Sequence, residues 1–308
     1  SGSAVSVLAN SSSGEGAVFQ SFFFPAQDEG GGREITWTGY SQALFLDTFG
    51  NLREDSNGDG KLVYDQDHII RTRVDATTND VVVDRFVDAD GNGLADSTTP
   101  SATVGLRDVN GIWEAGDRLA QTASATRKIK TWVDQDNNGL VAGTEWIDFT
   151  TTHATDLAPY LRADAAGTFT ADNIINFIRG DQIAGMRDRL LAGGDVWKLG
   201  DAIHGGPTSV GAPAQRYGVL YGDSSYTAFL AKYHNRRQVV YLGANDGMLH
   251  AFNGGFYHRG DDPGTSSKIE HGWFSTTATG VSNTPPLGEA LRLYPPRIAP
   301  SPQVAHAA

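Results

Sequence analysis

Residues 80–93 read Asp-Val-Val-Val-Asp-Arg-Phe-Val-Asp-Ala-Asp-Gly-Asn-Gly, and they place a strand directly before an acidic loop. The stretch 80–87 is rich in β-branched residues, which favour strands. The stretch 88–93 carries oxygen side chains at alternate positions. Because a strand leads into the loop, the pattern does not fit the helix-loop-helix unit of calcium sensors. It predicts a mainly β protein with structural ion-binding loops at strand ends.

The same acidic formula occurs three times: Asp-Ser-Asn-Gly-Asp-Gly at 55–60, Asp-Ala-Asp-Gly-Asn-Gly at 88–93 and Asp-Gln-Asp-Asn-Asn-Gly at 134–139. Oxygen side chains at positions one, three and five can converge on one calcium ion, and glycine at position six permits a sharp turn. We therefore predict three calcium loops. For any single copy, the alternative is that Asp, Asn and Gly cluster because they form solvated turns.

The third copy fits the whole calcium-loop pattern. Its position seven can offer a backbone carbonyl, and its position twelve is a glutamate, which can close the shell with both oxygens. The predicted ligands are Asp134, Asp136, Asn138, the Leu140 carbonyl and Glu145.

The second copy has Thr99 at position twelve and no acid there, but it has an aspartate at position nine. A shell of oxygen ligands therefore remains feasible. The predicted ligands are Asp88, Asp90, Asn92, the Leu94 carbonyl and Asp96.

In the first copy, position twelve is Gln66, with Asp65 and Asp67 on either side. A small change of register is needed to bring one of these carboxylates to the ion. The predicted ligands within the loop are Asp55, Asn57, Asp59 and the Lys61 carbonyl.

The composition of the chain indicates how large its core can be and what can stabilise it. The 308 residues are 39% hydrophobic and 10% aromatic, enough for a sizeable core in about two domains. The chain has no cysteine, which excludes disulfides, cysteine nucleophiles and sulfur-ligated metals. Bound calcium can supply stability instead, because extracellular calcium is often millimolar and a ligand that binds only the native state stabilises it.

The formal charge of −12 argues against nucleic acid and anionic membranes as partners. No run of eighteen apolar residues predicts a membrane span. The first residues lack the pattern of a signal peptide, so we expect any export signal to lie upstream or to have been removed.

Several further elements follow from local patterns. Residues 69–74 and 126–133 predict strands, the latter leading into the third loop. Two segments predict helices: 37–49, from the spacing of Trp37, Tyr40, Leu44, Phe45 and Phe49, and 173–179, which follows the helix starters Thr170 and Asp172 and precedes Gly180.

Residues 179–181 form the tripeptide Arg179-Gly180-Asp181. In an exposed loop of an adhesin, this sequence can engage an integrin-like receptor. The alternative, which the preceding helix favours, is that Arg179 and Asp181 simply flank a helix end.

The composition changes near Gly193, where we place a domain boundary. We expect a β-rich domain with three calcium loops and short helices at 1–192, and a β segment with a Pro- and Ala-rich tail at 193–308. In the second part, residues 237–244 and 248–252 predict a hairpin around the turn Asn245-Asp246-Gly247, similar to part of a β-propeller blade.

The hairpin at 239–252 and the segment Trp-Lys-Leu-Gly-Asp-Ala-Ile-His at 197–204 closely resemble the PilY family of type IV pilus tip-associated adhesins and assembly factors. Residues 37–40, 47–55, 112–119 and 127–132 resemble the region before the propeller in that family. The resemblance covers roughly residues 35 to 255.

This resemblance implies a secreted protein of the bacterial cell surface that is associated with pili, adhesion and surface sensing. The implied partners are pilus or minor pilin components and a host or surface receptor. The family also has a carboxy-terminal propeller that can bind calcium. That calcium loop would lie downstream of the hairpin, so it is not transferred to any residue here.

About fifty residues follow Phe252 in this sequence, which is a fraction of one propeller blade. We therefore expect an incomplete, truncated propeller sheet with an unpaired edge. Such edges recruit other strands. The alternative function is thus a subunit of a self-assembling extracellular filament, joined by strand addition, because a head-to-tail contact that does not close generates a fibre.

An enzyme is the third alternative. The hairpin also resembles blades of quinoprotein dehydrogenases, and His204, Asp246 and His250 are candidates for an acid, a base or metal ligands. However, the sequence has no nucleophile elbow, zinc-protease helix or phosphate loop. We therefore predict a non-enzymatic protein, with no catalytic residues and Ca²⁺ as the bound ion.

Overall fold

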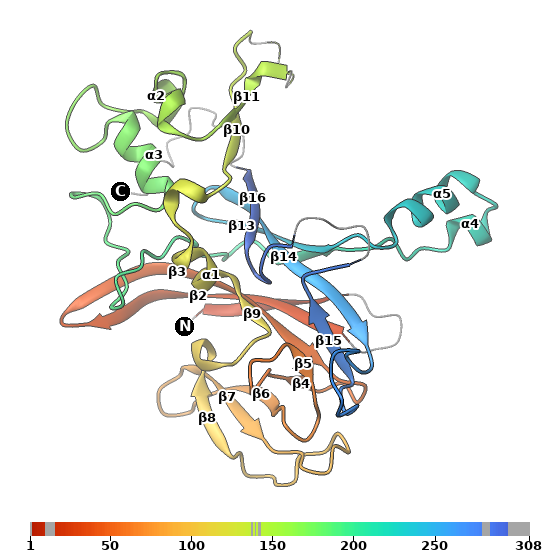
Figure 1. The fold of residues 1–308 in the computed structure, drawn as a ribbon. Helices are drawn as coiled ribbons and strands as arrows, with labels where there is room; N and C mark the ends of the chain where they lie inside the picture. The colour runs from red at the N-terminus through yellow and green to blue at the C-terminus, as the bar shows by residue number, and fades with distance from the viewer. Residues whose placement is uncertain are drawn as a thin grey trace.

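The computed structural model describes residues 2–9, 16–136, 138, 140, 143–278 and 284–294. This part is mainly β with a few helices, as the sequence predicts, and its paired strands are antiparallel (Figure 1). Most of the predicted Pro- and Ala-rich tail lies outside the described residues, and so does Gly139 of the third loop.

Eight strands form the first sheet, in the order β1-β2-β3-β4-β6-β7-β8, with β9 paired to β3. Their bounds are β1 Gly2–Ala9, β2 Gly16–Gly30, β3 Arg33–Leu46, β4 Leu52–Arg53, β6 Ile69–Val74, β7 Val81–Phe86, β8 Ala102–Gly105 and β9 Trp113–Glu114. The strands predicted at 69–74 and 80–87 are therefore confirmed as β6 and β7.

The predicted helix at 37–49 is wrong, because most of this segment belongs to β3, which forms a long hairpin with β2. Residues from Gly39 to Phe45 are all buried, so the strand is covered on both faces. A strand of this kind shows no alternation, and its apolar spacing can imitate that of a helix. The ring of Tyr40 stacks on the ring of Phe22 in β2, at 4.9 Å between centroids.

The second sheet has the order β12-β13-β14-β15-β5, with β16 also paired to β14. Its strands are β12 Thr208–Val210, β13 Gln238–Ala244, β14 Met248–Arg259, β15 Gly272–Ser275, β5 Lys61–Leu62 and β16 Ala290–Tyr294. The predicted hairpin is confirmed as β13 and β14, with Gly247 of the turn at φ +79°. The short strand β5 brings the first loop beside β15.

The largest hydrophobic cluster joins the two sheets. It contains Phe19 and Phe45 from the first sheet and Leu62, Phe252 and Phe274 from the second, all buried. A second cluster, around Tyr40, packs Trp197 against β3. Since buried side chains from both sides of residue 193 share one core, the boundary between 1–192 and 193–308 remains a prediction.

A smaller unit carries the third loop and is visible as the upper part of Figure 1. It consists of β10 Lys130–Trp132, β11 Trp146–Asp148, α2 Ala154–Leu161 and α3 Ala171–Arg179. The predicted strand at 126–133 is thus shorter than expected. The predicted helix at 173–179 is confirmed: the Thr170 side chain caps α3, and Gly180 ends it at φ +117°.

The remaining helical segments are short. They are α1 Ala115–Gln121, α4 Tyr217–Leu220, α5 Ser224–Tyr233 and the 3₁₀ turns Leu106–Asp108, Ser124–Thr126, Gly143–Glu145 and Thr151–His153. No helix in the described ranges is long and apolar enough to cross a membrane.

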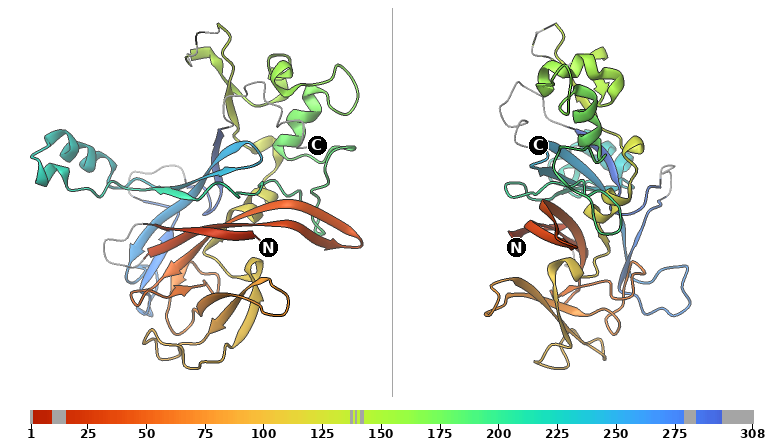
Figure 2. Two further views of the ribbon diagram at one scale, coloured as in Figure 1. Left: turned by 180° about the vertical axis from the view of Figure 1, so that it is seen from behind. Right: turned by 90° about the vertical axis from the view of Figure 1, so that its left-hand side faces the viewer.

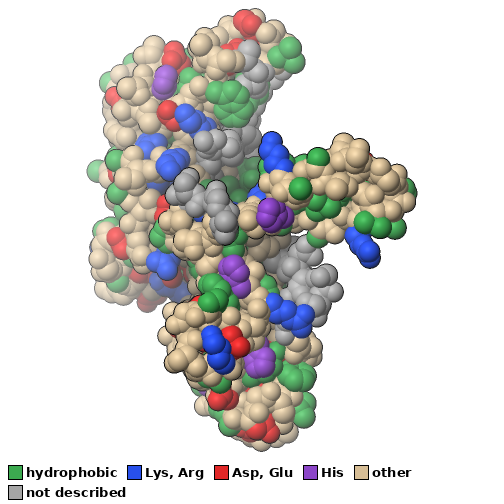
Figure 3. Space-filling view, turned by 45° about the vertical axis from the view of Figure 1, so that its right-hand side comes forward, with side chains coloured by type: hydrophobic (Ala, Val, Ile, Leu, Met, Phe, Trp, Pro, Cys, Tyr) green, Lys and Arg blue, Asp and Glu red, His purple; other side chains and the backbone are tan. Residues whose placement is uncertain are grey.

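Helices α4 and α5 form an arm that projects from the body of the molecule, as Figure 1, the left view of Figure 2 and the space-filling view in Figure 3 show. Neither helix has a buried residue. The arm carries exposed apolar side chains, among them Val219, Leu220 and Tyr221. It therefore adds little to the core.

Candidate metal centres

The three acidic loops lie at strand ends, as predicted. The first lies between β4 and β5, the second follows β7, and the third follows β10. Backbone and side-chain hydrogen bonds shape each loop, and they repeat from one loop to the next.

The residue at position five organises each loop. Its backbone N–H is donated to side-chain oxygens at positions one and three, at 3.0 and 3.2 Å in the first loop, 3.0 and 3.2 Å in the second, and 3.1 and 3.1 Å in the third. Its side-chain oxygen accepts the N–H of position seven, at 2.9, 2.8 and 2.7 Å. The residues at positions one, three, five and seven are Asp55, Asn57, Asp59 and Lys61; Asp88, Asp90, Asn92 and Leu94; and Asp134, Asp136, Asn138 and Leu140.

One carboxylate outside the six-residue formula closes each loop in the same way. It accepts the backbone N–H of position two, at 2.9 Å in the first loop, 3.0 Å in the second and 2.9 Å in the third. The closing residues are Asp67, Asp96 and Glu145. The sequence predicts the last two, but it leaves Asp67 as one of two neighbours of position twelve.

Asp67 occupies this place because the chain turns between Val63 and Asp67. The Asp67 N–H is donated to the Val63 carbonyl at 2.8 Å, and the Val63 N–H returns to the Asp67 carboxylate at 2.8 Å. Asp67 is buried, whereas Asp65 is exposed. The position of Asp67, one residue beyond the standard spacing, was the available sequence signal.

Two of the loops gather three carboxylates. Single oxygens of Asp88, Asp90 and Asp96 lie within 4.8 Å of one another, and so do those of Asp134, Asp136 and Glu145. Within the described residues, the first loop does not bring three acidic side chains together at this distance. Its position three is an asparagine. The donor sets consist of oxygen atoms, which suit a hard cation such as calcium.

Burial makes the acids of the first loop difficult to ionise. It raises the pKa of Asp67 to about 7, against the lowering effect of two backbone N–H groups, and nearby Asp55 and Asp59 raise it further. Burial also raises the pKa of Asp55 above its usual range. A bound cation would offset this mutual repulsion.

The guanidinium of Arg53 connects the first and second loops. It is fully buried, with Nε 2.7 Å from Asp47 Oδ2 and Nη2 ion-paired with Asp88. Its Nη1 donates to the carbonyls of Tyr64 and Asp67, at 2.7 and 2.9 Å. Sequence reasoning missed this residue, because its partners are scattered over two loops.

Among the candidates for catalysis, the structure pairs Asp246 with His250 and leaves His204 exposed. Asp246 Oδ2 lies 2.8 Å from His250 Nε2 and accepts the Gly200 N–H at 3.0 Å, while Oδ1 accepts the Met248 N–H. Burial alone would raise the pKa of Asp246, but His250 and these N–H groups hold it below its usual range. The carboxylate thus fastens the hairpin turn to the segment at residue 200.

The tripeptide at 179–181 is part of a helix end. The Arg179 side chain is buried and donates to the carbonyls of Phe149, Ser124 and Arg127, at 2.9, 2.7 and 3.0 Å. The Asp181 carboxylate accepts the Ser124 hydroxyl. This arrangement does not present the arginine to a receptor.

Comparison with curated proteins gives two matches relevant to the family. The chain is 44% identical over 87 residues to a type IV pilus biogenesis factor PilY1 homolog of Xylella fastidiosa, and 34% identical over 150 residues to the type IV pilus biogenesis factor PilY1 of Pseudomonas aeruginosa. The matches cover 26% and 46% of this chain, but only 7% and 12% of those proteins.

No family model matches the chain, and no solved structure gives a significant match. The two curated relatives carry the comparison, and their matched segments are a small part of their own length. At the level of the family, they confirm the resemblance to PilY that the sequence motifs indicate.

Proposed function

We propose that this chain is a non-enzymatic, calcium-stabilised part of a pilus-associated bacterial surface protein of the PilY type. The observation that carries the calcium assignment is the hydrogen-bond pattern shared by the three loops, each closed by a carboxylate that accepts the N–H of position two. The recurrence of the same closing carboxylate in three separate loops supports a ligand that is common to all three.

Calcium would act as a clip between segments. In the third loop, it would join Asp134, after β10, to Glu145, just before β11. In the first, it would join the end of β4 to the turn that follows β5. Since such an ion binds only when these segments are in place, it stabilises the folded chain by mass action. Weak sites suffice at millimolar extracellular calcium.

The relatives support a proposal about location and partners. Both are named type IV pilus biogenesis factors, so we propose that the chain acts at the bacterial surface, beside pilus or minor pilin components. From the resemblance to the PilY adhesins, we further propose that it contributes to adhesion to a host or surface receptor. Because Arg179 is buried, the tripeptide at 179–181 is not part of the receptor-binding surface that we propose. The oxygens of Asp246 are engaged in holding a turn, which supports a structural role for this acid.

Self-assembly by strand addition is the second candidate. Strand β16 pairs with β14 and, within the described residues, has no second neighbour, and β12 pairs only with β13. An edge of this kind offers backbone N–H and C=O groups to a strand from another copy. Negative-stain imaging with and without EGTA separates the candidates: ordered fibres favour the filament, and discrete particles favour the pilus-associated module.

Calorimetric titration of EGTA-treated protein tests the calcium assignment. We expect calcium to bind and to raise the melting temperature, and Glu145→Gln to remove one binding event. Asp148→Asn is the matched control, since Asp148 is an exposed acid three residues away that pairs with Lys130. An unchanged melting temperature after chelation would contradict the assignment.

A further inference from the structure

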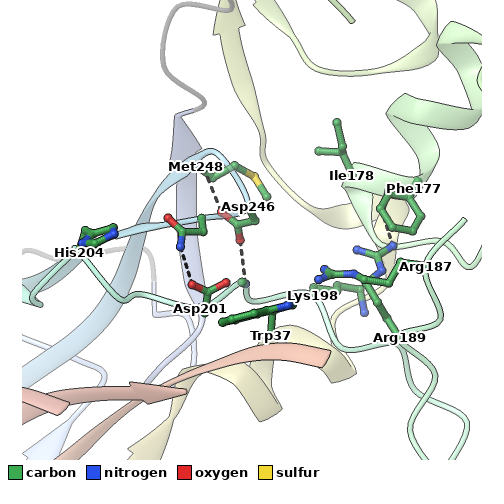
Figure 4. Close-up of a pocket in the computed structure, with 12 residues that line it drawn as sticks. Trp37, Phe177, Ile178, Arg187, Arg189, Lys198, Asp201, His204, Asp246 and Met248 are labelled. Atoms are coloured by element: carbon green, nitrogen blue, oxygen red, sulfur yellow. Dashed lines mark hydrogen bonds between the residues drawn. The ribbon is translucent and has the colours of Figure 1, made fainter. Parts of the chain in front are cut away.

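A pocket of about 460 Å³ lies where the β13–β14 turn meets α3 and the segments around residues 187 and 200. It does not include the calcium loops. Figure 4 shows its side chains in two groups, with cations on the side of α3 and carboxylates on the side of the turn. The charged and aromatic residues that line it include Trp37, Arg187, Arg189, Lys198, Asp201 and Asp246.

The cationic side consists of Arg187, Arg189 and Lys198. Within the described residues, none of the three has a carboxylate within 4 Å. Arg189 is 7% exposed, and its Nη2 donates to the Phe177 and Asp181 carbonyls at 2.7 and 3.1 Å. The buried Nε atoms of Arg187 and Arg189 lack a hydrogen-bond partner among the described residues.

These cations are close enough to repel one another. Burial and, to a lesser extent, the charges of Arg187 and Arg127 together lower the pKa of Arg189 to about 9. Burial likewise lowers the pKa of Lys198 to about 8, with Arg127 and Arg189 adding to the effect. Lys198 Nζ donates to the carbonyls of Ala120 and Val196, at 2.8 and 3.1 Å, so it has hydrogen bonds but no opposite charge beside it. A buried charge without an opposite charge is costly. An anion placed among these groups would relieve that cost.

The opposite side presents acceptors. Asp201 accepts the side-chain N–H of Asn245, and Asp246 accepts the Gly200 N–H. Asp246 Oδ2 also pairs with His250 Nε2, whereas its Oδ1 accepts only the Met248 N–H and keeps a lone pair for a hydroxyl group. Asp201 has acceptor capacity left in the same way. Their negative charge disfavours a dianion such as phosphate in the same pocket.

The rim contributes an aromatic face. Trp37 is 46% exposed, although β3 is otherwise buried from Gly39 onward, and its backbone lies at φ +55°. A bulky residue in this left-handed region is strained by on the order of 1–3 kcal/mol, and such strain clusters at ligand clamps. The bridge between Thr38 and Gly200 holds the backbone in place beside it.

We propose that this pocket binds an acidic saccharide, a sugar ring that carries one carboxylate. The carboxylate lies among Arg187, Arg189 and Lys198, where guanidinium groups suit its planar geometry. The ring lies against Trp37, and its hydroxyls donate to Asp201 and Asp246. The inference is independent of calcium binding and of the pilus assignment.

Saturation-transfer NMR and calorimetry on the full chain, at one fixed calcium concentration, test the proposal with glucuronate, glucose and inorganic phosphate. We expect glucuronate to bind with a dissociation constant of about 1 mM, and glucose and phosphate to bind at least ten-fold more weakly. Absence of glucuronate binding would overturn the proposal. Equal binding of phosphate would overturn the saccharide assignment and leave a general anion site.

Two variants assign the binding to this pocket. Trp37→Gly should weaken glucuronate binding about ten-fold and leave the protein folded, because glycine adopts φ +55° without strain and this gain offsets the lost stacking on Phe23. Arg187→Gln should weaken it by at least as much. Two control variants, Trp146→Ala and Arg107→Gln, should leave glucuronate binding unchanged. Trp146 is exposed near the third loop, and Arg107 pairs with Glu29 outside the pocket. Full binding by a folded Trp37→Gly variant would contradict the proposed contact.

Discussion

The Nη1 atom of Arg53 donates a 2.9 Å hydrogen bond to the carbonyl of Asp67, while the same guanidinium is ion-paired with Asp88. The closing residue of the first loop and the first residue of the second loop are thus held by one buried cation. We therefore expect the two loops to respond together when this cation is removed.

Replacing Arg53 tests this connection. Arg53→Met should lower the free energy of unfolding by about 3–5 kcal/mol, because it leaves Asp47 and Asp88 buried without their partner. Chemical denaturation measures the change. The control Arg33→Met removes an arginine whose ion pair with Asp188 is exposed on both sides, and it should have little effect. Similar losses for the two variants would argue against a special role for Arg53.

The first loop can be assigned by comparing two neighbouring acids. Asp67→Asn should remove one calcium-binding event from the calorimetric titration, since Asp67 closes the loop through the Ser56 N–H. Asp65→Asn should leave the titration unchanged, because Asp65 is exposed on the other side of Gln66. Loss of the event only in the Asp65 variant would show that the ligand is the other neighbour.

The N-cap residue of helix α1, Glu114, should make the free energy of unfolding depend on pH. The Glu114 carboxylate accepts the N–H groups of Ser41, Gly116 and Asp117, but burial, with a contribution from the charge of Asp117, raises its pKa from 4.5 to about 7. The folded chain therefore binds an extra proton in this window. The stabilising contribution of this group is fully present below pH 4.5 and is lost as the pH rises through about 7.

Glu114→Gln should remove this contribution. The difference in unfolding free energy between wild type and variant should therefore change with pH between about 4.5 and 7, by on the order of 2 kcal/mol. Thermal or chemical unfolding across that range measures it. The exposed Glu34→Gln serves as the control. A constant difference across the range would mean that Glu114 is not the titrating group.

The contact between β3 and the segment at residue 200 depends on a glycine. A Cβ added at Gly39 would lie 1.9 Å from the carbonyl oxygen of Gly200, and the Gly39 N–H donates to the Leu199 carbonyl at 3.0 Å. Gly39→Ala should therefore destabilise the fold by about 3 kcal/mol, because backbone atoms must move. Gly243→Ala, where a Cβ meets nothing within 4 Å, should be nearly neutral in the same unfolding measurement.

Local patterns predicted the elements whose signals are local. The strands at 69–74 and 80–87, the hairpin at 237–252 and the helix ending at Gly180 are all visible as alternation, turn residues or caps. The segment 37–49 was predicted as a helix because a strand buried on both faces lacks alternation. This segment is a strand because other parts of the protein cover both of its faces, and the local sequence does not show that contact.

In the candidate metal centres too, the sequence predicted the features with a local signal and missed those that depend on distant segments. Spacing along the chain predicted the calcium-loop residues, and the structure gives these loops one hydrogen-bond pattern. It did not single out Asp67, because a turn at Val63 sets the register there. Arg53 could not be predicted at all, since its carboxylate partners, Asp47 and Asp88, come from different segments. The pocket near Trp37 likewise depends on contacts between distant segments.

The pairing of Leu62 in β5 with Gly272 in β15 has a consequence for when this protein folds. Some 210 residues separate the two partners, so the chain loses loop entropy before this contact forms. Structures with such non-local pairings fold slowly. The core shared by the two sheets can therefore be completed only after β15 has been synthesised. Until then, β5 lacks the strand that holds the first loop beside the second sheet.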